Sequence, residues 1–201
     1  MDRKKIVFLA EIAILAALVL LLSFTPLGYL RIGPLSLSLL MIPVAIGAVV
    51  MGPLAGAILG CLFGLTSFAQ CFMGDFLGGI LVAANPFFAF VVCVVSRTLA
   101  GLLCGLVFKA FKGSQKVGPV LVANLSASLL NTVLFLGLLA LLYFNLSFTP
   151  EQAQALQANS TIGLVILTAT SINAPIELAL CGVVGTAVSK AVLKLNATRT
   201  L

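Results

Sequence analysis

Long apolar runs with almost no charge dominate this sequence, and they limit its possible folds more than any other feature. Six runs cover approximately residues 6–24, 36–51, 53–70, 87–111, 117–144 and 162–189. A helix that spans a bilayer needs roughly 20 mostly apolar residues. A transmembrane barrel would instead show ~10-residue segments of alternating polarity. The pattern therefore predicts an all-α integral membrane protein with six transmembrane helices in a single domain of residues 1–201.

The composition excludes several other classes of protein. Of the 201 residues, 62% are hydrophobic and 8% are charged, against about 25% charged residues in a typical soluble domain. So few charges cannot cover a water-soluble globule, which excludes soluble folds, disordered chains and nucleic-acid-binding modules. The chain has no His, and its five Cys form no Cys-x-x-Cys pair. We therefore expect no metal site and no cofactor.

The basic residues predict how the chain is oriented in the membrane. Nine of the eleven Lys and Arg residues lie before the first run, between the fourth and fifth, or after the sixth: Arg3, Lys4, Lys5, Lys109, Lys112, Lys116, Lys190, Lys194 and Arg199. Six spans would place all nine on one side, and cytoplasmic loops are enriched in Lys and Arg. We expect both termini to be cytoplasmic. Because no small-residue cleavage site follows the first run, we expect it to be a retained helix.

Small residues recur at helical spacing in two of the runs. The third run has a glycine at every fourth position: Gly52, Gly56, Gly60 and Gly64. The first run carries Ala13 and Ala17 at the same spacing. In lipid, small residues at this spacing let helix backbones approach closely. Packing within the protein is the simpler interpretation of each stripe, and docking to another membrane protein is the alternative.

Three ionisable residues fall inside the apolar runs, namely Glu11, Arg97 and Glu177. Each costs about 2.5–3.5 kcal/mol on insertion scales, so each calls for a structural or functional reason. With a helical rise of ~1.5 Å per residue, Arg97 and Glu177 lie roughly 18 and 20 Å from the cytoplasmic end of their helices. Glu11 lies close to the cytoplasmic edge, where we expect it to have a structural or partner-contact role.

Amide side chains occur at a similar depth. Asn131 and Asn173 lie roughly 16–18 Å beneath the outer face, as Arg97 does, by the same helical rise. Ser128 shares a helical face with Asn131, and Pro175 is expected to kink the sixth helix between Asn173 and Glu177.

These polar groups allow two interpretations. Arg97 and Glu177 form a structural ion pair, with the amides joining helices through hydrogen bonds. Alternatively, they line an outward-facing pocket for a small solute. An arginine suits a carboxylate in bidentate geometry, so the pocket would favour an anionic solute. The outer connections 25–35 and 66–86, which contain Gly and Pro, would then be its gates.

Several motifs extend across nearly the whole chain. They are Ala13-x-x-x-Ala17, Ile-Gly-Pro-Leu-Ser-Leu-Ser at 32–38, Ile-Pro-Val-Ala-Ile-Gly-Ala at 42–48, Gly52-Pro53 and Gly-Leu-Thr-Ser-Phe at 64–68. With these motifs the chain resembles the substrate-binding S components of energy-coupling factor (ECF) vitamin transporters. Three further stretches make it most similar to the pantothenate-specific members: 64–72, Asn85-Pro86-Phe87 and Ile172-Asn173-Ala174.

The resemblance implies a multi-pass protein of the bacterial plasma membrane that captures a vitamin from outside, with ATP hydrolysed by other subunits. The loops between helices 1–2 and 3–4 would close over solute held by helices 4, 5 and 6. Arg97 would meet the carboxylate of pantothenate, and six other residues complete the expected site: Asn131, Asn173, Gln70, Asn85, Ser128 and Glu177. Ala13 and Ala17 would dock on a membrane T component coupled to two ATPases, and the bound S component would topple to release its vitamin.

Other functions remain open from the sequence. Another vitamin, such as riboflavin, folate or a biotin-like acid, would keep the transport function. A structural or assembly protein would use the polar groups only to join helices. An enzyme would need a nucleophile with a base, or paired carboxylates, and the separated Glu11 and Glu177 do not provide such a pair.

Overall fold

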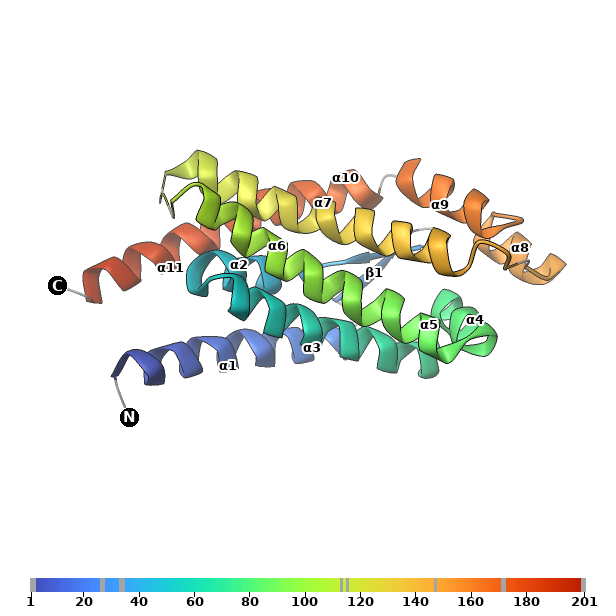
Figure 1. Cartoon of the computed structure of the whole chain (residues 1–201), viewed down its shortest axis with the longest axis horizontal. Coiled ribbons are helices and arrows are strands. Elements are labelled where there is room, and N and C mark those ends of the chain that lie inside the picture. Colours follow the sequence, from blue (N-terminus) through green and yellow to red (C-terminus); the bar gives the residue numbers. More distant parts are fainter. Residues whose placement is uncertain are drawn as a thin grey trace.

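The computed structural model describes residues 3–25, 28–32, 35–112, 114, 116–146, 148–170 and 173–199, which form an elongated helical bundle (Figure 1). The helices are α1 (Arg3–Ser23), α2 (Met41–Met51), α3 (Pro53–Phe72), α4 (Phe76–Ala84), α5 (Pro86–Phe90), α6 (Ser96–Ala110), α7 (Val117–Leu142), α8 (Pro150–Leu156), α9 (Thr161–Thr170), α10 (Asn173–Leu180) and α11 (Thr186–Arg199). Two π-helical turns, η1 (Val91–Val95) and η2 (Cys181–Gly185), join α5 to α6 and α10 to α11. Strands β1 (Tyr29–Ile32) and β2 (Leu35–Ser38) form an antiparallel hairpin.

In the described part of the chain, five helical stretches are long and apolar enough to cross a membrane. They are Ile6–Ser23, Pro53–Phe72, Pro86–Ala110, Val117–Leu142 and Asn173–Ala197. Four of them match predicted runs closely, and the fifth overlaps the predicted sixth run. The chain is thus a multi-pass helical membrane protein, and the predicted number of six spans is not confirmed.

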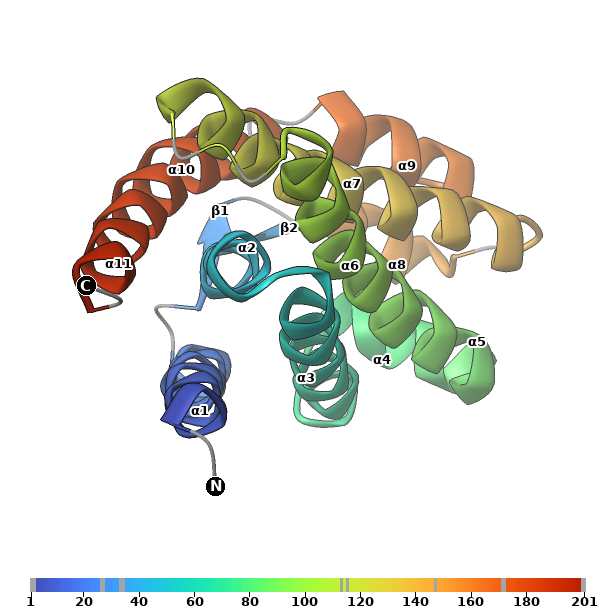
Figure 2. The same cartoon turned by 60° about the vertical axis from the view of Figure 1, so that its left-hand side comes forward.

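The predicted run 36–51 is wrong as a single span. Leu35–Ser38 forms β2, and α2 begins only at Met41. The Leu-Ser-Leu-Ser alternation has the period of a strand, a signal that the apolar run concealed. The 11 residues of α2 rise only ~16 Å, about half of the hydrocarbon core. Most of α2 is buried, because α1, α3, α6, α7 and α11 surround it (Figure 2).

The predicted sixth run is divided. Helix α9 ends at Thr170 and α10 begins at Asn173, while residues 171 and 172, including Ile172 of the motif, lie outside the described residues. From there the helix continues through η2 to Arg199. Pro175 lies in the first turn of α10, where proline removes no intrahelical hydrogen bond. The break therefore precedes the proline and is not centred on it.

Two of the segments between the predicted runs contain short helices. Asp75 caps α4 by accepting a hydrogen bond from the backbone N–H of Gly78 at 2.7 Å. Thr149 and Gln152 form a capping box that starts α8. Such boxes satisfy two otherwise unpaired backbone donors, which lets a seven-residue helix form outside the main bundle.

The glycine stripe packs inside the protein, as the simpler interpretation predicted. A Cβ at Gly60 would clash with the carbonyl oxygen of Arg97, and one at Gly56 would clash with that of Gly101. A Cβ at Gly64 would lie 2.6 Å from Cα of Val94. Helix α3 therefore lies in backbone contact with η1 and α6. Gly52 differs: its φ of 98° provides the turn between α2 and α3.

Three basic segments lie at one end of the bundle. Helix α1 begins there, α11 ends there, and the α6–α7 connection lies beside them (Figure 1). Asn196 joins the two outer helices by donating a hydrogen bond to Glu11 at 3.0 Å. The hairpin, α4 and α8 lie toward the opposite end. This arrangement agrees with the charge distribution, and the cytoplasmic location of the termini stays a prediction.

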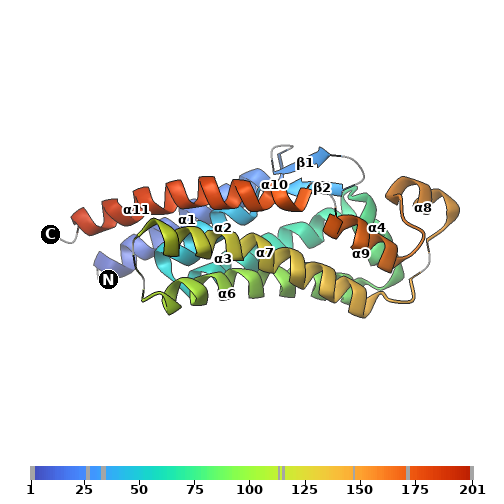
Figure 3. The same ribbon diagram turned by 90° about the horizontal axis from the view of Figure 1, so that it is seen from above.

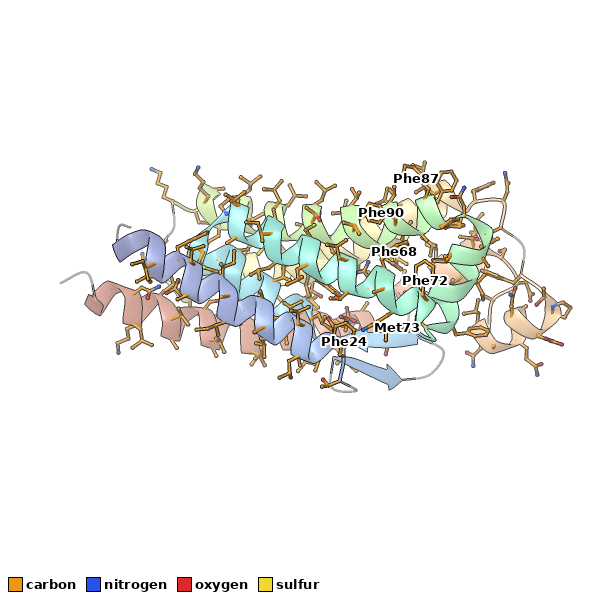
Figure 4. The ribbon with its side chains drawn as sticks, turned by 90° about the horizontal axis from the view of Figure 1, so that it is seen from below. Phe24, Phe68, Phe72, Met73, Phe87 and Phe90 are labelled. Atoms are coloured by element: carbon orange, nitrogen blue, oxygen red, sulfur yellow. The ribbon has the colours of Figure 1, made fainter. Side chains whose placement is uncertain are left out.

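Large apolar side chains are exposed on the outside of the bundle. Phe24, Phe72, Met73 and Phe87 are each at least 60% exposed and gather near the hairpin end (Figure 4). A bilayer would cover these side chains, which are too numerous for a water-facing surface.

Candidate substrate-binding site

A cavity of about 380 Å³ lies among α3, η1–α6, α7 and α10. At the hairpin end it is bounded by β2, the start of α4, and α8. Its polar lining residues are Ser38, Ser67, Gln70, Asp75, Arg97, Asn131, Thr132, Thr168, Asn173 and Glu177. A volume of this size fits a small organic molecule, and mixed apolar and polar walls are typical of ligand sites.

Arg97 is held rigidly in the cavity wall. The residue is 9% exposed, and its Nη1 donates to the carbonyl oxygen of Cys93 at 3.0 Å. The guanidinium carbon lies 4.8 Å from the ring centre of Phe63 and 5.1 Å from that of Phe135. These cation–π contacts fix the plane of the guanidinium. Among the described residues Nε has no hydrogen-bond partner, so donor capacity remains for a ligand.

The local backbone explains how Arg97 reaches this position. The π-helical turn η1 directly precedes α6, and π-helical turns are common at functional sites. Side chains donate to carbonyl oxygens within this turn: Ser96 to Val92 at 2.5 Å and Thr98 to Val94 at 2.7 Å. Gly60 allows α3 to touch the backbone at Arg97. The guanidinium therefore projects from a closely supported segment.

Glu177 also lines the cavity, but it is hydrogen-bonded elsewhere. The backbone N–H of Ser38 donates to Oε1 of Glu177 at 2.5 Å. The carboxylate therefore ties β2 to α10, beside which the hairpin lies (Figure 3). Within the described ranges Glu177 accepts from the backbone of Ser38, whereas Arg97 donates to the carbonyl oxygen of Cys93 and, at 3.5 Å, to Oγ of Ser96. The two side chains are not hydrogen-bonded to each other there. Of the two interpretations, the structural ion pair is thus not observed, and in the described part of the chain no carboxylate is hydrogen-bonded to Arg97.

Two asparagines complete the polar wall. Asn131 on α7 is 9% exposed, and its Oδ1 is buried without a hydrogen-bond partner in the described part of the chain. Asn173 is the first residue of α10, and both it and Ala174 line the cavity. A helix N-terminus carries partial positive charge, so α10 adds to the potential of Arg97. The structure thus brings Arg97, Asn131, Asn173 and Glu177 together from three helices.

The other three predicted residues differ in position. Gln70 lines the cavity, and its Nε2 donates to the carbonyl oxygen of Ser23 at the end of α1. Asn85 lies outside, where its Oδ1 caps α5 by accepting from the N–H groups of Phe87 and Phe88. Ser128 is buried one turn from Asn131 and does not line the cavity. We therefore leave Asn85 and Ser128 out of the candidate site.

Sequence reasoning missed the rings that flank Arg97 and the pair Cys71 and Cys93. Phe63 and Phe135 are two of the eleven phenylalanines in the apolar runs, and nothing in their spacing separates them from those that face lipid. The two cysteines are 22 residues apart and form no Cys-x-x-Cys pair, yet their sulfur atoms lie 3.9 Å apart in the cavity wall.

The comparison with protein families agrees with this architecture. The family model "ECF transporter, substrate-specific component" matches residues 7–188, which include all the described cavity residues. The chain belongs to this family. The predicted resemblance to ECF S components is therefore confirmed.

A pantothenate transporter named PanT, from Leuconostoc mesenteroides subsp. mesenteroides, is similar to part of this ECF substrate-specific component. The two are 31% identical over 111 residues, which is 55% of this chain and 52% of the relative. The match thus spans about half of the length of each protein. It supports the narrower resemblance without extending over the whole chain.

Proposed function

We propose that this ECF substrate-specific component binds pantothenate in the cavity around Arg97. The observation that carries the proposal is a buried, rigidly held guanidinium that, among the residues the structure describes, has unused donor capacity and no bonded carboxylate. A ligand carboxylate would neutralise this charge through short, charge-assisted hydrogen bonds. The N-terminus of α10 lies at the same cavity and favours an anion as well.

The rest of the cavity suits the rest of pantothenate. The vitamin has an amide, two hydroxyls and a branched apolar segment. The unpaired Oδ1 of Asn131 can accept from a hydroxyl or amide N–H, and Gln70 and Asn173 offer further polar contacts. Phe63, Phe135 and Leu136 provide apolar walls. Glu177 acts through the hairpin, which it holds against α10.

Transport requires partners in this proposal. The protein captures the vitamin from outside at the bacterial plasma membrane and is not itself an enzyme, since two ATPase subunits coupled to a membrane T component hydrolyse the ATP. Helix α1 presents the docking surface, because Ala13 and Ala17 are exposed beside Ile14, which is 68% exposed. Docking would let the loaded subunit topple and release its ligand inward.

The experiment is thermal melting of the detergent-solubilised protein with pantothenate, riboflavin, folate and biotin. A ligand at a hundredfold excess over its Kd stabilises the fold by ~2.7 kcal/mol, so pantothenate should raise the melting temperature clearly. In folded Arg97→Ala and Arg97→Lys variants, the Kd for pantothenate should rise roughly thirtyfold, a loss of about 2 kcal/mol of binding free energy. Neither Ala nor Lys can bind a carboxylate through two parallel N–H groups as the guanidinium can.

Each other outcome is informative. A shift with a different vitamin would replace pantothenate and keep the transport function. A cooperatively melting wild type that responds to none of the four would favour a structural or assembly protein. Undiminished binding by both Arg97 variants would remove Arg97 from the site.

A further inference from the structure

Two cysteine side chains face each other in the cavity wall. Cys71 comes from the last turn of α3 and Cys93 from η1, and their Sγ atoms lie 3.9 Å apart. They are 7% and 3% exposed, and both line the cavity. The sulfur–sulfur bond of a disulfide is about 2.05 Å long, so the two sulfurs need to approach by about 2 Å.

The cavity gives small reagents a route to both thiols. Its wall includes Gly74 and Asp75, which are exposed in the α3–α4 turn. Cys71 faces the sulfur of Cys93 and donates to the carbonyl oxygen of Ser67 at 3.3 Å, a weak hydrogen bond that rotation about its Cα–Cβ bond can break. An oxidant that enters from this side therefore meets two adjacent thiols.

Cys93 is also a support for the guanidinium of the proposed site. Its carbonyl oxygen accepts the 3.0 Å hydrogen bond from Nη1 of Arg97. A covalent link from Cys93 to α3 would pull on η1 and shift this carbonyl. A displacement of even 1 Å at a binding group is costly, because bidentate contacts depend on exact placement.

We propose that Cys71 and Cys93 form a redox-active dithiol whose oxidation to a disulfide weakens ligand binding. With a peroxide as oxidant, one thiolate attacks the O–O bond, giving a sulfenic acid and releasing hydroxide. The second sulfur then attacks the sulfenic sulfur, the S–S bond forms, and the S–O oxygen leaves as water. The two thiols lose two electrons and two protons in total, and hydrogen peroxide is reduced to two waters. A thiol reductant reverses the change.

The first test needs no ligand. The full-length protein in detergent is treated with hydrogen peroxide, its remaining thiols are alkylated, and its peptides are mapped by mass spectrometry. We expect a Cys71–Cys93 linkage that dithiothreitol removes. Cys104→Ser/Cys181→Ser is the matched control, because both residues are buried outside the cavity and donate to α7 carbonyls at 3.2 Å. This control should still form the linkage, and Cys71→Ser should not. Absence of the linkage in the wild type would overturn the proposal.

The second test measures the consequence and rests on the proposed function. Each protein is compared with itself before and after oxidation, with pantothenate as the probe. Wild type should bind about tenfold more weakly when oxidised and recover on reduction, whereas Cys71→Ser should show no change. A linkage that forms without altering affinity would refute the regulatory effect. If the reduced wild type does not bind pantothenate, the proposed function fails. The linkage assay still decides whether Cys71 and Cys93 form a reversible disulfide.

Discussion

At the scale of single residues, Arg97 and Asn131 carry polar atoms that are buried without hydrogen-bond partners among the described residues. Such atoms cost about 1–3 kcal/mol each. A purely structural role does not explain why two such unpaired polar atoms lie at one cavity. A ligand that bonds to both recovers this cost, so affinity and stability should respond in opposite ways to their removal.

Replacing Asn131 with Leu should separate these effects. The side chains have similar shapes, and Leu removes the unpaired oxygen, so the free protein should melt no lower than wild type. Pantothenate affinity should fall by about 1–3 kcal/mol, roughly 5- to 150-fold, in calorimetric titration. Ser128→Ala is the control on the same helix, since Ser128 lies outside the cavity and its loss should leave affinity unchanged. Normal binding by Asn131→Leu would exclude this contact.

Tyr143 offers a second residue-scale prediction. Its hydroxyl lies 2.8 Å from the carbonyl oxygen of Leu81 and 2.7 Å from that of Asn85, which ties the end of α7 to α4 and α5. Tyr143→Phe should lower the free energy of unfolding by about 1–2 kcal/mol. Burial raises the pKa of Tyr143 from 10.0 to about 12. Because the folded pKa is the higher one, this contribution is complete below pH 10 and is lost as the pH rises to 12. Melting curves of both proteins across that window test the prediction, and a difference that stays constant would contradict it.

At the scale of elements, the contact between α3 and α6 depends on glycines that leave no room for a side chain. Gly60→Ala would force the backbones apart at Arg97, which should cost about 1–3 kcal/mol and also reduce ligand affinity. Gly137→Ala is the matched control, because nothing lies within 4 Å of a Cβ there. Alanine stabilises a helix interior, so this control should melt equally or slightly higher. Equal melting of the two variants would show that α3 and α6 are not closely packed.

The sequence predicted elements best where a single physical signal was present. Long runs such as 117–144 gave the position of α7 to within two residues, because continuous apolar composition is enough to define a span. The prediction of elements fails where a second signal, such as the alternation of a strand, lies inside an apolar run. The Leu-Ser-Leu-Ser strand was merged with α2, and the start of α10 was hidden, because a helix break before Asn173 changes hydrophobicity very little. The π-helical turns left no mark in composition at all.

The candidate site was predictable in depth but not in detail. Helical rise placed Arg97, Asn131 and Asn173 at one level, and the structure brings them to one cavity. The partner of Glu177 could not be foreseen, because a backbone N–H of the hairpin 139 residues away carries no side-chain signature. The ring pair around Arg97 was hidden for a related reason, since apolar contacts within a bundle resemble apolar contacts with lipid.

At the scale of the whole molecule, α1 is the least buried of the five apolar stretches, with only 11% of the residues in Ile6–Ser23 buried. Ala13→Leu/Ala17→Leu should leave pantothenate binding by the isolated subunit intact, since neither residue lines the cavity. The double variant should lose co-purification with the T component and ATPases, and vitamin uptake by cells should fall. Gly137→Leu makes a comparable change at an exposed position on α7 and should assemble normally. Normal assembly of the α1 variant would place the docking surface elsewhere.

The shortness of α2 determines how much space the bundle leaves for the cavity. Hydrophobic matching sets the length of a helix that faces lipid, but neighbouring helices screen α2 from lipid along most of its course. It can therefore stop after 11 residues without exposing its ends to hydrocarbon. A full-length helix along the same axis would extend into the space now shared by the hairpin and the cavity. The short, shielded helix thus leaves room for the cavity inside the bundle, while the surrounding helices keep their full length.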